Sequence, residues 1–124
     1  MSLKLAVVGN RTFDDPELMS KVLDRYRAEH PDMTIISGAA KGADTLAANY
    51  AKAHSLNLIE FPADWAQHGR RAGPLRNSQI VAEAEMLIAF WDEASTGTRD
   101  SINKAHARGI PVLVVTPMGR EYTY

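Results

Sequence analysis

Five short runs of apolar residues alternate with segments of helical periodicity along the 124 residues of this chain. Most of the runs are continuous, without the apolar–polar alternation of a half-exposed strand. Continuous runs are typical of strands that are covered on both faces, as in a parallel sheet. They predict five strands, over residues 5–8, 33–36, 56–61, 86–91 and 112–115.

The segments between these runs carry helix signals. Asp15, Pro16 and Glu17 combine a capping side chain, a proline suited to the first helical position and an acid in the first turn. Apolar residues at i, i+4 spacing predict a helix that begins here and three further helices. We expect the latter over residues 43–54, 76–85 and 98–108, the last ending at Gly109.

The β-α alternation predicts one α/β domain over residues 1–124, with a Rossmann-like three-layer architecture. Right-handed crossovers place helices on both faces of a five-stranded parallel sheet, for which we expect the strand order 3-2-1-4-5. Residues 117–124 are expected to form a peripheral tail. Ligands of such sheets bind beyond the carboxyl ends of the strands, where the strand order reverses, here between strands one and four.

Composition excludes several classes of function. A net charge of −1 argues against a duplex-DNA binder, which normally carries a basic stripe. The absence of cysteine excludes disulfides, thiolate nucleophiles and cysteine metal sites, and no His/Asp/Glu spacing resembles a metal site. No apolar run approaches the roughly 18 residues of a membrane span, and no signal peptide is evident. We therefore expect a cytoplasmic protein without a membrane partner or a metal. The sequence leaves open whether it forms a homo-oligomer.

The loop after the first strand reads Gly9-Asn10-Arg11. A glycine at a strand end allows a ligand to approach the backbone closely, and an arginine can bind a phosphate or a carboxylate. The alternative is a tight turn with a solvated arginine.

The loop after the second strand leads small residues into a helix start. Free N–H groups and the helix dipole make such a start an anion site. The spacing matches neither the P-loop nor the dinucleotide fingerprint, and a glycine-rich turn supported by Asp44 is the alternative. The candidate ligand-binding residues are Ser37, Gly38, Ala39, Lys41, Gly42 and Asp44.

The loop after the fourth strand also opens a helix, with Thr96, Gly97 and Thr98 after Ser95. Serine and threonine are ordinary N-caps, so this motif is weak alone. Two such helix starts at the same edge of one sheet favour phosphate binding.

The connection over residues 62–74 is long for such a domain, where about 2 to 6 residues are usual. It contains Trp65, which could stack on a base, although an anchor for the loop is the more ordinary role. Arg76 is expected at the start of the next helix, where a cation opposes the dipole. That placement indicates a ligand or an acidic partner, for which Asp64 is the candidate. Arg70 and Arg71 are expected on the solvated surface.

Together these segments resemble the SLOG superfamily, the Rossmann-like group that contains the Smf/DprA and LOG proteins, and within it the small YspA/YpsA-related branch. The matching segments cover almost the whole chain in order. They are 9–13, 37–44, 62–65, Gly69, 72–77 and 97–98.

The resemblance implies a pocket for nucleotides or nucleotide-derived ligands such as ADP-ribose. In LOG enzymes a catalytic glutamate follows the Gly-Thr loop, and the matching position here is Ser101. Arg76 matches the arginine of the LOG Arg-Lys pair, but Asn77 follows it. The resemblance therefore argues against phosphoribohydrolase activity.

We expect a domain that binds or senses a nucleotide-like ligand, with no certain cofactor. Its phosphates would lie on the helix starts at 38–43 and 97–98, Arg11, Arg76 and Asn77 would add polar contacts, and Trp65 would close over the base. One alternative is hydrolysis of a glycosidic or phosphoester bond, with Asp44, Asp64 or Asp100 as the carboxylate and Arg76 as a catalytic candidate. Another is single-stranded nucleic-acid binding, as in Smf/DprA.

Overall fold

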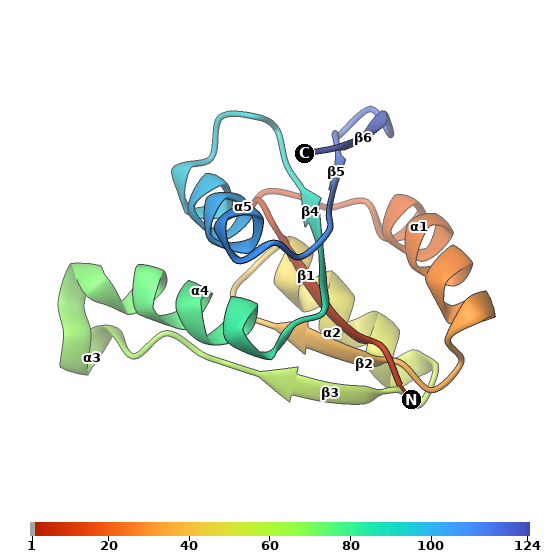
Figure 1. Cartoon of the computed structure of the whole chain (residues 1–124), viewed down its shortest axis with the longest axis horizontal. Coiled ribbons are helices and arrows are strands. Elements are labelled where there is room, and N and C mark those ends of the chain that lie inside the picture. Colours follow the sequence, from red (N-terminus) through yellow and green to blue (C-terminus); the bar gives the residue numbers. More distant parts are fainter. Residues whose placement is uncertain (1) are drawn as a thin grey trace.

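The computed structural model describes residues 2–124, in which a six-stranded sheet lies between two layers of helices (Figure 1). The elements follow the predicted alternation along the chain. In chain order they are β1 (Lys4–Gly9), α1 (Pro16–Glu29), β2 (Thr34–Ser37), α2 (Ala43–Ala53), β3 (Asn57–Glu60), α3 (Trp65–His68), the 3-10 helix η1 (Gly69–Arg71), α4 (Ala72–Glu83), β4 (Met86–Phe90), α5 (Thr96–Arg108), β5 (Val112–Val115) and β6 (Glu121–Thr123).

The sheet has the order β3-β2-β1-β4-β5-β6, and its first five members are parallel. This confirms the predicted order of the parallel core. β6 pairs antiparallel with β5 and lies inside the segment that we expected to be a tail. The chain turns back at Gly119, whose N–H donates to the Thr116 carbonyl at 2.8 Å and whose φ is +85°. The sequence did not predict β6, because this three-residue edge strand of Glu, Tyr and Thr contains no apolar run.

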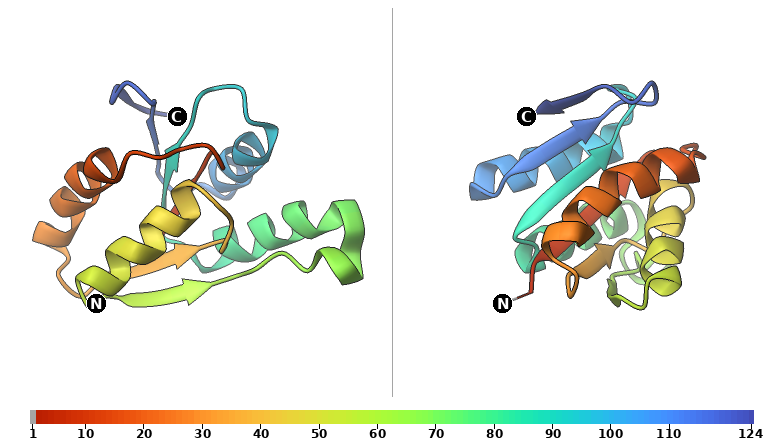
Figure 2. Two further views of the ribbon diagram at one scale, coloured as in Figure 1. Left: turned by 180° about the vertical axis from the view of Figure 1, so that it is seen from behind. Right: turned by 90° about the vertical axis from the view of Figure 1, so that its right-hand side faces the viewer.

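Both faces of the sheet are buried over β1, β2, β4 and β5, as the continuous apolar runs predict, whereas the edge strands β3 and β6 are partly exposed. Leu5 and Val7 of β1 face a core shared with α1 and α2, whereas Ala6 and Val8 face a core shared with α4 and α5. The end-on view in Figure 2 shows the two helix pairs on opposite sides of the sheet. None of the helices in residues 2–124 is long and apolar enough to cross a membrane.

The connection predicted as a long loop is largely helical. α3, η1 and α4 follow one another without a break from Trp65 to Glu83, so α4 begins at Ala72. The prediction that Arg76 opens a helix is therefore wrong, because Arg76 lies in the second turn. Pro74 sits in the first turn of α4, where proline is tolerated because an N–H there has no helical acceptor. α3 lies beyond the sheet, at the outer end of α4 (Figure 1).

The cap of α1 provides a matched test of the fold. The Asp15 carboxylate accepts from the Leu18 N–H at 3.0 Å, and α1 buries Met19, Val22 and Leu23 in the core. We expect Asp15→Ala to lower the free energy of unfolding by about 1 kcal/mol, the usual contribution of such a cap. The neighbouring, exposed Asp14→Ala should stay within about 0.5 kcal/mol of wild type. Urea denaturation measures both, and equal effects would contradict the assigned cap.

Candidate functional site

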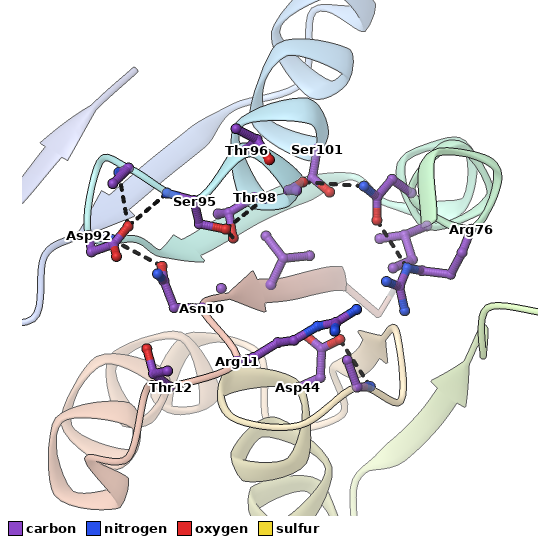
Figure 3. A pocket seen from close by; sticks show the side chains of 17 residues that line it. Asn10, Arg11, Thr12, Asp44, Arg76, Asp92, Ser95, Thr96, Thr98 and Ser101 are labelled. Carbon is purple, nitrogen blue, oxygen red and sulfur yellow. Dashed lines mark hydrogen bonds between the residues drawn. The ribbon is translucent and has the colours of Figure 1, made fainter. Parts of the chain in front are cut away.

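A cavity of about 630 Å³ lies at the carboxyl ends of β1 and β4. These two strands pair directly, with Gly9 opposite Phe90, and the chain leaves them toward opposite sides of the sheet. Figure 3 shows Asp44 and Arg11 on one side of the cavity and Ser95, Thr96 and Thr98 on the other. The lining residues are Val8, Gly9, Asn10, Arg11, Thr12, Ala40, Asp44, Arg76, Asn77, Ile80, Asp92, Ala94, Ser95, Thr96, Gly97, Thr98 and Ser101.

The end of β1 is packed too tightly for a side chain at Gly9. A Cβ there would lie 2.4 Å from the Phe90 carbonyl oxygen and 2.7 Å from the Ala43 Cβ. Asn10 then connects β1 to the loop after β4, since its N–H donates to the Phe90 oxygen and its Oδ1 accepts from the Asp92 N–H, both at 3.1 Å. The glycine and the asparagine therefore shape the floor of the cavity.

Two N–H groups around the start of α2 donate to acceptors inside the protein. The Ala43 N–H donates to the Asn10 carbonyl at 3.1 Å, and the Ala40 N–H donates to the Asp44 Oδ2 at 3.3 Å. The hydroxyl of Ser37 donates to the Asp44 carbonyl at 3.1 Å. Gly42, with φ +74°, packs directly against the backbone of the loop after β1, since a Cβ there would lie 2.3 Å from the Asn10 carbonyl oxygen. The Asp44 carboxylate thus takes up one N–H donor of this turn, that of Ala40.

The start of α5 leaves donors open. Its cap, Ser95, accepts weakly from the Thr98 N–H at 3.5 Å, and Asp92 accepts from the N–H groups of Ala94 and Ser95 at 2.9 Å. Thr96 and Gly97 line the cavity, and their N–H groups donate to no acceptor in the described part of the chain. First-turn amides lack helical acceptors, so these two can receive an anion.

Asp92 is a wall residue that the sequence places near a strand end but that we did not count among the ligand-binding residues. The Asn10 amide and the N–H groups of Ala94 and Ser95 lower the pKa of its carboxyl, so it is ionised at neutral pH. Its position directly after a strand, like that of Asn10 after β1, is the signal that could have identified it.

Arg76 reaches from α4 to the turn after β2. Its Nη1 donates to the Gly38 carbonyl at 2.5 Å and its Nε donates to the Asn77 Oδ1 at 3.0 Å. Asn77 in turn donates to the Asp100 carboxylate at 3.1 Å and to the Gly97 carbonyl at 3.3 Å. This chain of contacts connects α4 to both helix starts.

The expected partnership of Arg76 with Asp64 is wrong. Asp64 caps α3, where its carboxylate accepts from the Gln67 N–H at 3.1 Å. The acid whose charge acts on Arg76 is Asp44, while burial lowers the pKa of the guanidinium.

Asp44 is a buried carboxyl in the cavity wall. Burial raises its pKa to about 6, against the lowering effect of the Ala40 and Gly38 amides and of the charges on Arg76 and Arg11. Neither arginine lies within ion-pair distance of it among the pairs formed by residues 2–124. The carboxyl is thus near two cations without a direct salt bridge to either.

Comparison with known proteins places the chain in a family. Residues 3–68 match YAcAr, the YspA, cpYpsA-related SLOG family. The chain belongs to this SLOG family. Gene 61 protein of Mycobacterium phage D29 is 32% identical over 117 residues, which cover 89% of this chain and 94% of that protein.

Two solved structures of DNA processing protein A, DprA, share the fold of this SLOG chain. DprA from Streptococcus pneumoniae aligns with a TM-score of 0.74 and 22% identity, over 91% of this chain and 50% of that one. DprA from Helicobacter pylori, described in a study of its single-stranded DNA binding mode, aligns with a TM-score of 0.64 and 20% identity. That alignment covers 90% of this chain and 64% of the other.

The SLOG cavity contains only part of the predicted site. Gly9, Asn10, Arg11, Asp44, Arg76, Asn77, Thr96, Gly97 and Thr98 line it. Other predicted residues form the turn behind Asp44 or lie outside the lining: Ser37, Gly38, Ala39, Lys41, Gly42, Asp64 and Trp65.

Trp65 does not line the cavity, but its ring lies next to Arg11, which does. The indole is 51% exposed, and the Arg11 guanidinium lies 5.9 Å from its ring centroid. A Cβ on Gly73 would lie 3.3 Å from the ring, so a glycine at this point of α4 leaves room for it.

The wall also contains residues that the sequence did not single out for binding. Val8 and Ile80 supply apolar surface, and Ser101 stands buried where LOG enzymes carry glutamate. The remaining members are Thr12, Ala40, Asp92, Ala94 and Ser95. No group of three His, Asp or Glu side chains able to hold a metal ion occurs in the part of the chain that the structure describes.

The raised pKa of Asp44 predicts how stability depends on pH. Between pH 4 and 6 the unfolded chain ionises Asp44, with an ordinary pKa of 3.8, while the folded chain still holds the proton. Stability relative to Asp44→Asn should therefore fall as pH rises through this window and level off above it, by about 3 kcal/mol in total. Urea denaturation of both proteins from pH 4 to 7.5 measures the difference. A difference that stays constant, or that changes in favour of wild type, would contradict the burial of an unpaired carboxyl.

Proposed function

We propose that the cavity binds a phosphate-bearing nucleotide or nucleotide-derived ligand, with ADP-ribose as a representative. The observation that carries this proposal is the pair of N–H groups without an acceptor at Thr96 and Gly97, two residues that line the same cavity as Arg11 and Arg76. Backbone donors, a helix N-terminus and arginines together are the usual receptors of phosphate in proteins.

The cavity suggests how the ligand would lie. A phosphate would bind at the start of α5, with the Thr98 hydroxyl beside it. The sugar would lie over the end of β1, where Val8 and Ile80 provide apolar contact.

The base would stack on Trp65. This ring is half exposed and already receives the flat guanidinium of Arg11. The flat π face of a base can stack on this ring in place of the guanidinium. Arg11, displaced from the ring, would then bind the phosphate. This step distinguishes a nucleotide from a simple sugar phosphate.

Binding is better supported than turnover. Ser101 supplies no carboxylate, Asp64 is occupied as a cap, and the Asp92 carboxylate accepts two backbone N–H groups. Arg76 is held by the Gly38 carbonyl. Asp100 pairs with Lys104 at 2.9 Å and is not among the residues that line the cavity. Hydrolysis, which would need Asp44 as its acid, is thus the weaker proposal. A single-stranded DNA ligand, as in the H. pylori DprA study, finds little support in 14 basic against 15 acidic side chains.

Paired arginine variants test the proposal. Arg11 lines the cavity and makes no hydrogen bond in the described residues, so Arg11→Ala should leave the fold intact. We expect its affinity for ADP-ribose in calorimetry to fall about tenfold, which corresponds to 1.4 kcal/mol. Arg70, on η1 and outside the cavity, is the control, and Arg70→Ala should change affinity less than about twofold.

Other outcomes would contradict the proposal. Equal losses in the two variants would remove Arg11 from the site. No binding of ADP-ribose, together with tight and strongly salt-dependent binding of a thymidine oligonucleotide, would favour single-stranded DNA instead.

A further inference from the structure

We propose that the cavity takes up its anionic ligand together with one proton, which the Asp44 carboxyl holds. The inference rests on the proposed function, because it concerns how that same cavity accommodates added negative charge. In this proposal Asp44 makes ligand affinity depend on pH, because its carboxyl takes up a proton when the ligand binds.

The geometry isolates this carboxyl from water while leaving it in the cavity wall. Asp44 is 6% exposed, and its Oδ2 accepts from the Ala40 N–H at 3.3 Å. A Cβ built on Gly38 would lie 2.8 Å from this oxygen and 2.6 Å from the Arg76 Nη1, so both groups converge on one glycine. The guanidinium nevertheless donates to the Gly38 carbonyl and makes no ion pair with the carboxyl.

The charges that face Asp44 are few. The connection after β1 contributes Arg11, and α4 contributes Arg76. β2 ends in the uncharged Ser37, and the Glu60 side chain at the end of β3 belongs to an exposed residue.

The charged residues of α1 that contact α2 do so far from Asp44. Asp24 and Arg27 of α1 both bond to the hydroxyl of Tyr50, in the second half of α2. On its own loop, Lys41 is exposed. The two arginines are thus the cations whose charge compensates an ionised Asp44.

A bound phosphate competes for that compensation. It draws the charge of Arg11 and Arg76 to itself and adds negative charge to the same cavity, so an ionised Asp44 becomes less favourable. Burial already raises the pKa of Asp44 to about 6, and a further rise on binding places the proton on it at neutral pH. Asp92, the other carboxyl of the wall, keeps the donors that lower its pKa and so remains ionised.

This coupling has a measurable sign. If the bound state holds one proton more than the free state, affinity falls as pH rises above 6, by roughly tenfold per pH unit. Replacing Asp44 by the neutral asparagine should remove this dependence and should make binding above pH 7 tighter than in wild type.

Calorimetry with ADP-ribose tests the proposal, because the two phosphates of this probe stay ionised from pH 6 to 8. Titrations at pH 7 in two buffers of different ionisation enthalpy measure the protons taken up directly on wild-type protein. We expect close to one proton for wild type and for the control Glu60→Gln, and none for Asp44→Asn.

Each result decides a different point. Binding without proton uptake would overturn the inference and leave the proposed function standing. Uptake that persists in Asp44→Asn would assign the proton to another group and overturn the role of Asp44. Failure of ADP-ribose to bind at every pH would overturn the proposed function and the inference with it.

Discussion

The contact between the start of α2 and the backbone after β1 determines most of the site. Gly42, in a conformation that glycine adopts without strain, brings the Ala43 N–H onto the Asn10 carbonyl. That approach uses the Ala43 N–H at the start of α2, buries Asp44 and places Arg11 at the cavity. At the start of α5, the N–H groups of Thr96 and Gly97 donate to no acceptor in the described residues, and both residues line the cavity.

The same contact explains why charge is arranged asymmetrically. On the α2 side, a buried carboxyl stands near two arginines without an ion pair, and burial keeps its pKa near 6. On the α5 side, Asp92 is bound by backbone amides and two further amides stay free. The cavity therefore combines an anion receptor with an acid that can exchange its proton.

The sequence predicts the parallel core well because double-faced burial requires continuous apolar runs, whereas β6 has no such run and depends on its pairing with β5. It also predicts which loops meet at the sheet edge. It does not predict that the Asn10 carbonyl and the Asp44 carboxylate take up donors of the turn at 38–44, since 38–44 and 95–98 both contain small residues and only contacts made in the fold distinguish them. The helix expected from Arg76 begins at Ala72, a start that the sequence does not reveal because its first turn, with Gly73 and Pro74, carries none of the apolar spacing that revealed the rest.

The claim that the anion binds at α5, and not at α2, can be tested residue by residue. In a ¹H–¹⁵N correlation spectrum, titration with ADP-ribose should shift the amide signals of Thr96 and Gly97 most, because these N–H groups gain an acceptor. Shifts concentrated at Gly38 and Ala40, with Thr96 and Gly97 unchanged, would show that the ligand displaces Asp44 from its turn and would contradict this account.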